Sequence, residues 1–319
     1  MNDISIENAI LAAIKAIQRN FSKKLLSVYV TGSYANGYAV SSSDLDLFFV
    51  FEGYLNKADE KIGEDINTLL QDISPSLDIA FRGLENLIES GKVGMNEYFL
   101  HVFGEPVHLR IPMPKIEDYI YRGMHTGYLR MQLTRKTKPY TWPLRYPDDK
   151  SPLKGYDWRE KIKYQNKQFN SIKEIVVLTG WMATGLIAWR GKIYVPTKNH
   201  VINLFKSVIG GHLADDLQNI MEVCRVQFEY MTPETTEELL VLEKVLPRVL
   251  EFENFFLKNY QDFLIENLYS TNPIRVRTSI IRLGEILYPN DNSLNALKRL
   301  SSDINNYSDL IDKSISQLQ

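Results

Sequence analysis

Asp44 and Asp46 stand two residues apart at the start of an apolar, aromatic run that ends at Phe51. In a strand, side chains at positions i and i+2 point to the same face, so we expect the two carboxylates to lie side by side. Neighbouring carboxylates repel each other unless a cation neutralises them. Because Mg²⁺ prefers carboxylate oxygens together with phosphate oxygens of a substrate, this pair predicts a metal site.

A glycine–serine pair, Gly32-Ser33, lies upstream of these acids, where a predicted strand at residues 25–30 ends. Glycine lets the backbone approach a ligand closely, and the serine hydroxyl adds a hydrogen-bond donor. Backbone N–H groups of a turn built from small residues can surround a phosphate. Ser43, directly before Asp44, is a further candidate for the nucleotide site and, equally, a candidate turn residue.

A third acid, Asp78, lies between Leu77 and Ile79 in a predicted strand at residues 77–81. An acid within an apolar strand needs a partner for its charge. If this strand lies beside the strand of Asp46, the three carboxylates form one cluster. Such a cluster can hold metal ions that stabilise the attacking and leaving oxygens of a phosphoryl or nucleotidyl transfer.

The order of these residues resembles the nucleotidyltransferase superfamily of DNA polymerase beta. The resemblance covers about residues 6–111 and rests on Gly32-Ser33, on the Asp44-Leu45-Asp46 pattern and on the later acid Asp78. It implies that the glycine–serine pair contacts the triphosphate of an NTP and that the paired aspartates bind two Mg²⁺ ions. It also implies that Asp78 binds metal or activates the acceptor hydroxyl. ATP is the expected donor by family habit.

The remainder of the chain is similar to the helical part of aminoglycoside and streptomycin adenylyltransferases, in which a helical domain follows the nucleotidyltransferase domain. The stretch from Tyr156 to Pro196, with its turn at 191–196, resembles one in bacterial relatives of unassigned substrate. Lys192 and Tyr194 of this turn are candidates for the nucleotide site, or else belong to an ordinary turn between helices.

Hydrophobic periodicity predicts the elements that must position these residues. Apolar residues at helical spacing indicate helices at 6–20 and 56–73, and the uncharged run 175–189 indicates a buried core helix. Short aromatic and β-branched runs indicate strands. The expected strands are 25–30, 45–51, 77–81 and 107–111.

These elements predict an α+β protein: an N-terminal nucleotidyltransferase-fold mixed sheet with flanking helices, followed by a C-terminal helical bundle. We expect a catalytic domain at 1–115, a basic, proline-rich connector at 116–159 and a helical domain at 160–319. The active site is expected in the cleft between the two domains.

Composition sets wide limits on the kind of protein. The 319 residues are 44% hydrophobic and 24% charged, which excludes wholesale disorder. The single cysteine, Cys224, excludes a disulfide framework and a cysteine-based zinc cluster. The N-terminus lacks the basic start and apolar core of a signal peptide, so we expect a cytoplasmic protein of bacterial type without a membrane segment. The sequence does not predict the oligomeric state.

The overall charge of −2 is the balance of two opposed segments. Residues 122–167 carry a net charge of +8 and residues 215–266 a net charge of −8. The acidic segment suits a polycationic acceptor such as an aminoglycoside. The basic segment suits RNA, because phosphate neutralisation dominates RNA binding, and both segments are equally explained as solvated helix faces.

Three functions follow as hypotheses. The first is Mg²⁺-dependent transfer of a nucleoside monophosphate, AMP from ATP, to a hydroxyl of a small molecule. The second is the same chemistry on RNA, tRNA or a protein, or oligonucleotide synthesis. The third is a non-catalytic, NTP-binding protein of antitoxin type.

Overall fold

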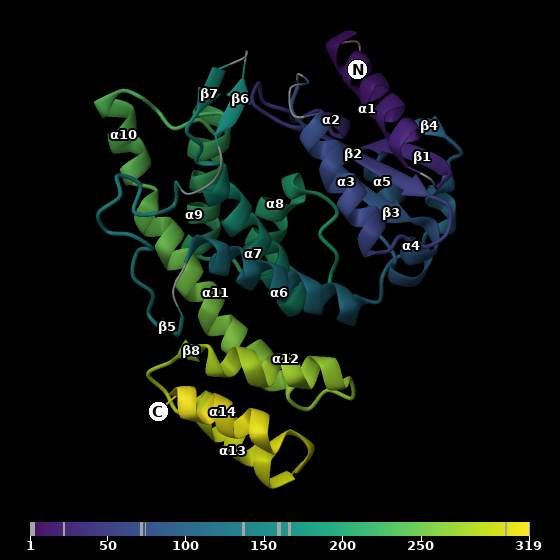
Figure 1. The fold of residues 1–319 in the computed structure, drawn as a ribbon. Coiled ribbons are helices and arrows are strands. Elements are labelled where there is room, and N and C mark those ends of the chain that lie inside the picture. The colour runs from purple at the N-terminus through teal and green to yellow at the C-terminus, as the bar shows by residue number, and fades with distance from the viewer. Residues whose placement is uncertain are drawn as a thin grey trace.

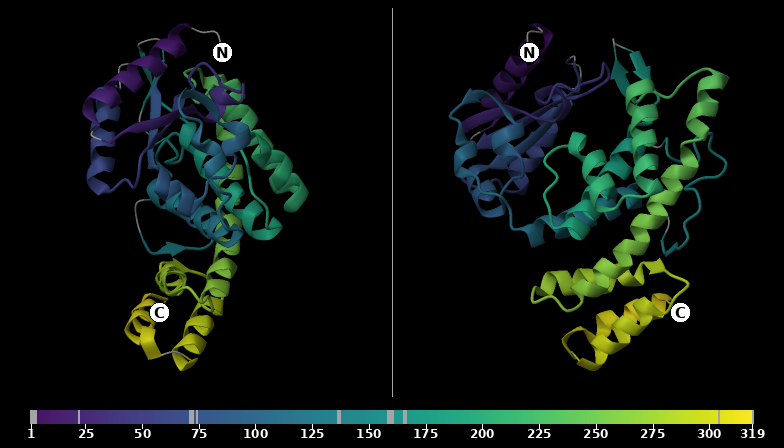
Figure 2. Two further views of the ribbon diagram at one scale, coloured as in Figure 1. Left: turned by 90° about the vertical axis from the view of Figure 1, so that its right-hand side faces the viewer. Right: turned by 180° about the vertical axis from the view of Figure 1, so that it is seen from behind.

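The computed structural model describes residues 4–21, 23–70, 73, 75–135, 138–157, 161–164, 167–303 and 305–318. An N-terminal α/β part lies on one side of the molecule and a larger helical part on the other (Figure 1). Views from the side and from behind show the same division, with the last helices projecting beyond both (Figure 2).

The N-terminal part is built on a four-stranded sheet in the order β3-β2-β1-β4. Its strands are β1 (Leu25–Val30), β2 (Leu45–Phe51), β3 (Leu77–Gly83) and β4 (Leu100–Gly104). Strand β1 pairs antiparallel with β2 and β4, whereas β2 and β3 run parallel. The mixed sheet that the sequence predicts is therefore confirmed.

The two faces of this sheet are covered differently. One face packs against α1 (Ile4–Asn20) and α3 (Lys57–Leu69) through an entirely apolar core that includes Ile17, Phe49 and Phe81. The other face packs against α4 (Leu84–Ser90), α5 (Met95–Tyr98) and the short helix η1 (Val107–Arg110). In β2 the residues before and after Asp46 point into the first core. Asp46 therefore points to the second face, as Phe48 does.

The expected strand at 107–111 is wrong, because this segment forms η1 and the fourth strand is β4. Val107 and Ile111 are both buried and lie four residues apart, a spacing that puts them on one side of a helical turn. The edge position beside β1 is taken by Leu100–Gly104, which bonds to it from Ser27 to Val30.

The helical part has one large core around α7 (Lys173–Gly191), which is buried along most of its length. The uncharged run at 175–189 within this helix reflects its burial on most sides. No helix among the described residues is long and apolar enough to cross a membrane. The other elements of this part, including short strands, are α6 (Ile116–Thr134), β6 (Ile162–Tyr164), β7 (Lys167–Phe169), α8 (Lys198–Val208), α9 (His212–Met221), η2 (Glu222–Gln227), α10 (Thr236–Glu243) and α11 (Leu246–Asn267).

Helix α6 occupies the first half of the segment expected as a connector, and it packs against α7 in the helical core. The two helices lie very close at Gly123 and Gly185: a Cβ atom added to Gly185 would lie 2.9 Å from the carbonyl oxygen of Gly123. Residues 138–157 are largely irregular, as expected, apart from β5 (Tyr140–Thr141). We therefore propose that the helical domain begins at about residue 116. Lys136 and Arg159 of the basic segment lie outside the described residues.

The last helices form a small unit below the N-terminal part and the main helical part (Figure 1). It consists of α12 (Pro273–Gly284), β8 (Ile286–Leu287), α13 (Asn292–Asp303), η3 (Asn305–Tyr307) and α14 (Ser308–Leu318). Helix α11 connects this unit to the rest of the helical domain, and β8 pairs with β5. The helical bundle that the sequence predicts after the sheet is confirmed.

Candidate active site

The parallel pairing of β2 and β3 brings two of the three candidate acids together. In this register Asp46 lies directly opposite Asp78, and Asp44 is the residue just before the first residue of β2. Asp78 is exposed, whereas Asp44 and Asp46 are half-buried. The three carboxylates are thus gathered at one end of two neighbouring strands.

The glycine–serine turn lies directly against this cluster. Gly32 has φ +63°, and a Cβ atom at this position would lie 2.0 Å from Oδ2 of Asp46. The backbone N–H of Thr31 donates to the carbonyl oxygen of Asp46 at 2.9 Å. Only glycine fits such a position, both for its backbone conformation and for the space available. The turn from Gly32 to Ala35 is a short helix, α2.

The electrostatics of Asp46 differ from those of an ordinary surface carboxylate. Burial raises the pKa of Asp46 to about 6, with Asp78 and Asp44 adding to the rise, while Lys198 and Lys173 act against it. Burial is the main cause of the raised pKa, and in this site three carboxylates stand against two lysines. A site with this excess of negative charge has the hard oxygen donors that suit Mg²⁺.

The compensating cations come from the helical domain, and no motif in the sequence analysis points to them. Lys173 forms an ion pair with Asp44, and its ammonium group lies 5.9 Å from the centre of the Tyr230 ring. Lys173 and Lys198 are the first residues of α7 and α8. No spacing links them to Asp44 or Asp46 in the sequence, so only the packing of the two domains could reveal them.

A second set of contacts ties the helical domain to the loop that precedes Asp44. The hydroxyl of Ser41 donates to the carboxylate of Glu229, and the hydroxyl of Ser42 donates to the carbonyl oxygen of Glu229. Arg225 donates to the carbonyl oxygen of Tyr38 at 3.0 Å. These bonds hold the loop 38–43 against the end of η2.

Glu229, which accepts from both serines, and the next residue, Tyr230, have an uncommon backbone conformation. Glu229 and Tyr230 have φ angles of +47° and +68°. Such values are uncommon for residues other than glycine and cluster at functional sites. Burial raises the pKa of Tyr230, and Asp44 and Asp46 are among the groups that add to the rise, so its phenol faces the acidic cluster.

The remaining sequence candidates lie in structural positions. Ser43 is buried and closes a turn, where its hydroxyl accepts from the N–H of Val40 at 2.9 Å. Lys192 ends α7 with φ +53°. Tyr194 packs on the Tyr119 ring and donates to the carbonyl oxygen of Pro114 at 2.5 Å. Among the contacts of the described residues, none joins these three to the acids.

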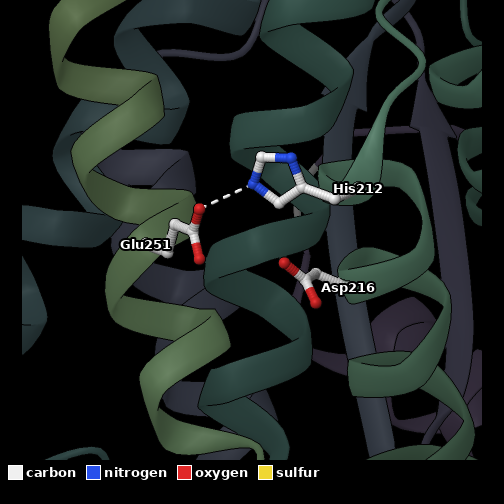
Figure 3. Close-up of side chains that lie close together, drawn as sticks. All are labelled: His212, Asp216 and Glu251. Atoms are coloured by element: carbon white, nitrogen blue, oxygen red, sulfur yellow. Dashed lines mark hydrogen bonds and ion pairs between the residues drawn. The ribbon is translucent and has the colours of Figure 1, made fainter.

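His212, Asp216 and Glu251 form another group of potential metal ligands, with one ligand atom from each within 4.8 Å of the others (Figure 3). His212 and Asp216 lie one turn apart on α9, and Glu251 comes from α11. The ring of His212 is 2.6 Å from Glu251, and Asp216 forms an ion pair with Arg248. These charges are satisfied by one another, which is the ordinary arrangement of a surface ion-pair network.

Comparison with known proteins agrees with the N-terminal architecture. Residues 12–123 match the family model described as a nucleotidyltransferase domain. A solved structure of spectinomycin adenyltransferase from Enterococcus faecialis with ATP and spectinomycin is similar at 11% identity and a TM-score of 0.41, covering 78% of this chain and 99% of that chain.

A solved toxin–antitoxin complex with AMP-PNP is similar at 18% identity and a TM-score of 0.22, covering 41% of this chain and 92% of that chain. Neither TM-score is high enough to support an argument about function. A search of curated proteins found no match.

Proposed function

We propose that this chain, whose residues 12–123 form a nucleotidyltransferase domain, transfers AMP from ATP to a hydroxyl group of a small-molecule acceptor. The observation that carries the proposal is the pairing of Asp46 with Asp78 beside Asp44 and against the Gly32 turn. A carboxylate cluster next to a closely approachable backbone turn suits the polarisation and transfer of a phosphoryl group.

Each residue of the cluster has a proposed role. Asp44, Asp46 and Asp78 would hold Mg²⁺, which supplies charge neutralisation at the phosphates when bound. Gly32 and Ser33 would contact the triphosphate, as the resemblance to the superfamily implies. Asp78 is the exposed member of the cluster, so it is also placed to accept the proton of the acceptor hydroxyl.

The cations of the helical domain would act on the same substrate. Lys173 and Lys198 already lie within electrostatic reach of Asp46. With a nucleotide bound, their ammonium groups would stabilise negative charge on the phosphates and on the departing pyrophosphate. This role requires both domains, so we propose that the functional unit is the whole chain rather than its N-terminal half.

Pyrophosphate release tests the proposed function. We would incubate the protein with each of the four NTPs and MgCl₂, with and without fractions of small metabolites, and use Asp44→Asn as the matched blank. Release that depends on one NTP and one fraction supports nucleotidyl transfer. Absence of release from every mixture, together with tight ATP binding, would contradict it and favour a non-catalytic binding protein.

A further inference from the structure

A group of three cations lies on the catalytic side of the sheet, away from the carboxylates. Arg82 is near the end of β3, Lys92 follows α4, and Arg122 lies on α6. The ammonium of Lys92 lies 5.6 Å from the Phe48 ring centre and 5.7 Å from that of Phe99. All three cations therefore border the face of the sheet that carries Asp46 and Asp78.

These cations act on one another without a balancing acid. Burial lowers the pKa of Lys92, and the charges of Arg82 and Arg122 lower it further. Arg122 donates to the carbonyl oxygen of Ser90 at 3.4 Å, which brings its guanidinium next to the Lys92 segment. Arg82 donates to the carbonyl oxygen of its own neighbour, Phe81, at 2.6 Å.

Among the described residues, no carboxylate forms an ion pair with any of the three cations. Two acids of the neighbouring helices are engaged elsewhere: Glu89 accepts from Tyr54, and Asp118 forms an ion pair with Arg275. Lys92 is half-buried, whereas Arg82 and Arg122 are exposed. An anion would stabilise a half-buried cation that lies near two like charges. The arrangement is thus complementary to a bound anion.

The position of the cations separates them from the expected triphosphate contacts at Gly32-Ser33. Along β3, Asp78 and Arg82 are four residues apart on the same face, which corresponds to about 13 Å of strand. Lys92 lies above Phe48, which is two residue pairs along the sheet from Asp46 and Asp78 and on the same face. A molecule with its hydroxyl at Asp78 could therefore extend an anionic group to these cations.

We propose that Arg82, Lys92 and Arg122 form an acceptor-side anion site, and that the acceptor is a small, phosphorylated hydroxyl compound. The identification of the ligand as an acceptor rests on the proposed function, whereas the anion site itself does not depend on that function. Guanidinium groups bind phosphate through paired hydrogen bonds, and the ammonium adds a point charge.

Several acids of the 215–266 segment are already engaged. Five are paired within the helical domain: Glu253 with Arg135, Glu251 with His212, Asp216 with Arg248, Asp262 with Arg190 and Glu266 with Trp189. Glu229 accepts from Ser41 of the N-terminal domain. A phosphate group matches the charge of the three cations, whereas a polycationic acceptor does not.

Binding of inorganic phosphate tests the site without any turnover. We would titrate phosphate by calorimetry into the protein saturated with MgCl₂ and α,β-methylene-ATP, at low and moderate NaCl. The variants are Arg82→Gln/Arg122→Gln and Lys92→Met, which keeps most of the apolar stem over Phe48. The matched control is Arg19→Gln, an exposed arginine on α1 at the opposite face of the sheet.

We expect wild type and Arg19→Gln to bind phosphate equally and the other variants to bind it at least about tenfold more weakly. Their affinity for the ATP analogue should stay within about twofold of wild type, with unchanged circular dichroism. Equal phosphate binding by all proteins, or none by wild type, would overturn the proposal. Parallel loss of nucleotide affinity would assign the cations to the triphosphate instead.

The acceptor class is then tested by transfer. Sugar phosphates and nucleoside monophosphates are offered with ATP, and aminoglycosides serve as the polycationic comparison. Transfer to a phosphorylated compound that weakens in Arg82→Gln/Arg122→Gln supports the inference. Transfer to aminoglycosides alone would overturn it while leaving nucleotidyl transfer intact, whereas phosphate binding without any transfer would refute only the proposed reaction.

Discussion

Two clusters of carboxylates and cations in this molecule show opposite electrostatics. In the cleft, burial and the neighbouring acids raise the pKa of Asp46 to about 6. At the base of the helical domain, burial acts to raise the pKa of Glu285, but hydrogen bonds from Lys138, Arg282 and Tyr128 outweigh it and the pKa is lowered. The Lys138 and Arg282 contacts are both 2.6 Å long.

The difference lies in how many charges are balanced within the chain. Glu285 meets two cations and a phenol, so its ionised form is stabilised in the folded protein. The carboxyl group of Asp46 is buried beside two other carboxylates, and the charges of Lys198 and Lys173 do not outweigh the effect of burial. A closed ion-pair network serves stability, whereas an unbalanced one is a candidate site for a cationic ligand. Variants in each of the two clusters test this contrast.

The largest expected effect is that of Asp46→Asn on turnover. Loss of one metal-binding carboxylate should lower pyrophosphate release at least about 1,000-fold, equivalent to about 4 kcal/mol of barrier. The same change removes a repulsive charge, so the urea midpoint should stay equal or rise. A variant that is inactive because it unfolds would contradict the comparison.

Glu285→Gln should show the reverse pattern. The variant leaves Lys138 and Arg282 without their carboxylate, so we expect about 2 kcal/mol lower unfolding free energy in urea. Turnover should remain within about twofold of wild type at a temperature where both proteins are folded. Glu243→Gln, an exposed glutamate on α10, serves as the control and should change neither quantity.

Glu229→Ala should have a smaller effect that is confined to catalysis. The variant removes the acceptor for Ser41 and loosens the loop that precedes Asp44. We expect kcat to fall about tenfold, as for residues that orient metal ligands, and KM for ATP to change little. Glu229→Gln keeps a side-chain oxygen for this bond and should restore most of the rate. Glu237→Ala, at the exposed start of α10, is the control: it removes the same charge elsewhere and should leave kcat unchanged.

The smallest effect is in the pH dependence of stability, measured by urea unfolding in EDTA. Because the pKa of Asp46 is raised from 3.8 to about 6, the folded state binds the extra proton in this range, and stability falls as pH rises through it. In Asp46→Asn this decrease of stability with rising pH should be smaller. Glu285 has a lowered pKa, so its contribution is present at neutral pH and is lost on acidification. Identical curves for the two variants would contradict the comparison.

Local sequence patterns were sufficient for much of the fold. The apolar, aromatic run of β2 and the helical spacing in α1 are local patterns, and the acids of β2 and β3 stand out because their neighbours are apolar. The parallel register that pairs Asp46 with Asp78 then follows from the sheet.

Features that depend on packing between distant segments were not predictable in this way. The segment that forms η1 was predicted as the fourth strand, and β4 was not predicted. Both segments are short, and only pairing with β1 distinguishes them. Lys173 is more than a hundred residues from Asp44 in the chain. Its contribution to the cleft arises from the docking of two cores, which no local pattern encodes.

The contact between Gly123 and Gly185 joins the two helices through which the domains are connected. Helix α6 follows the N-terminal domain in the chain, and α7 begins with Lys173, which pairs with Asp44. A single methyl group at Gly185 would meet backbone atoms at 2.9 Å and force the helices to shift. We therefore expect two residues without side chains to influence the position of Lys173 relative to Asp44.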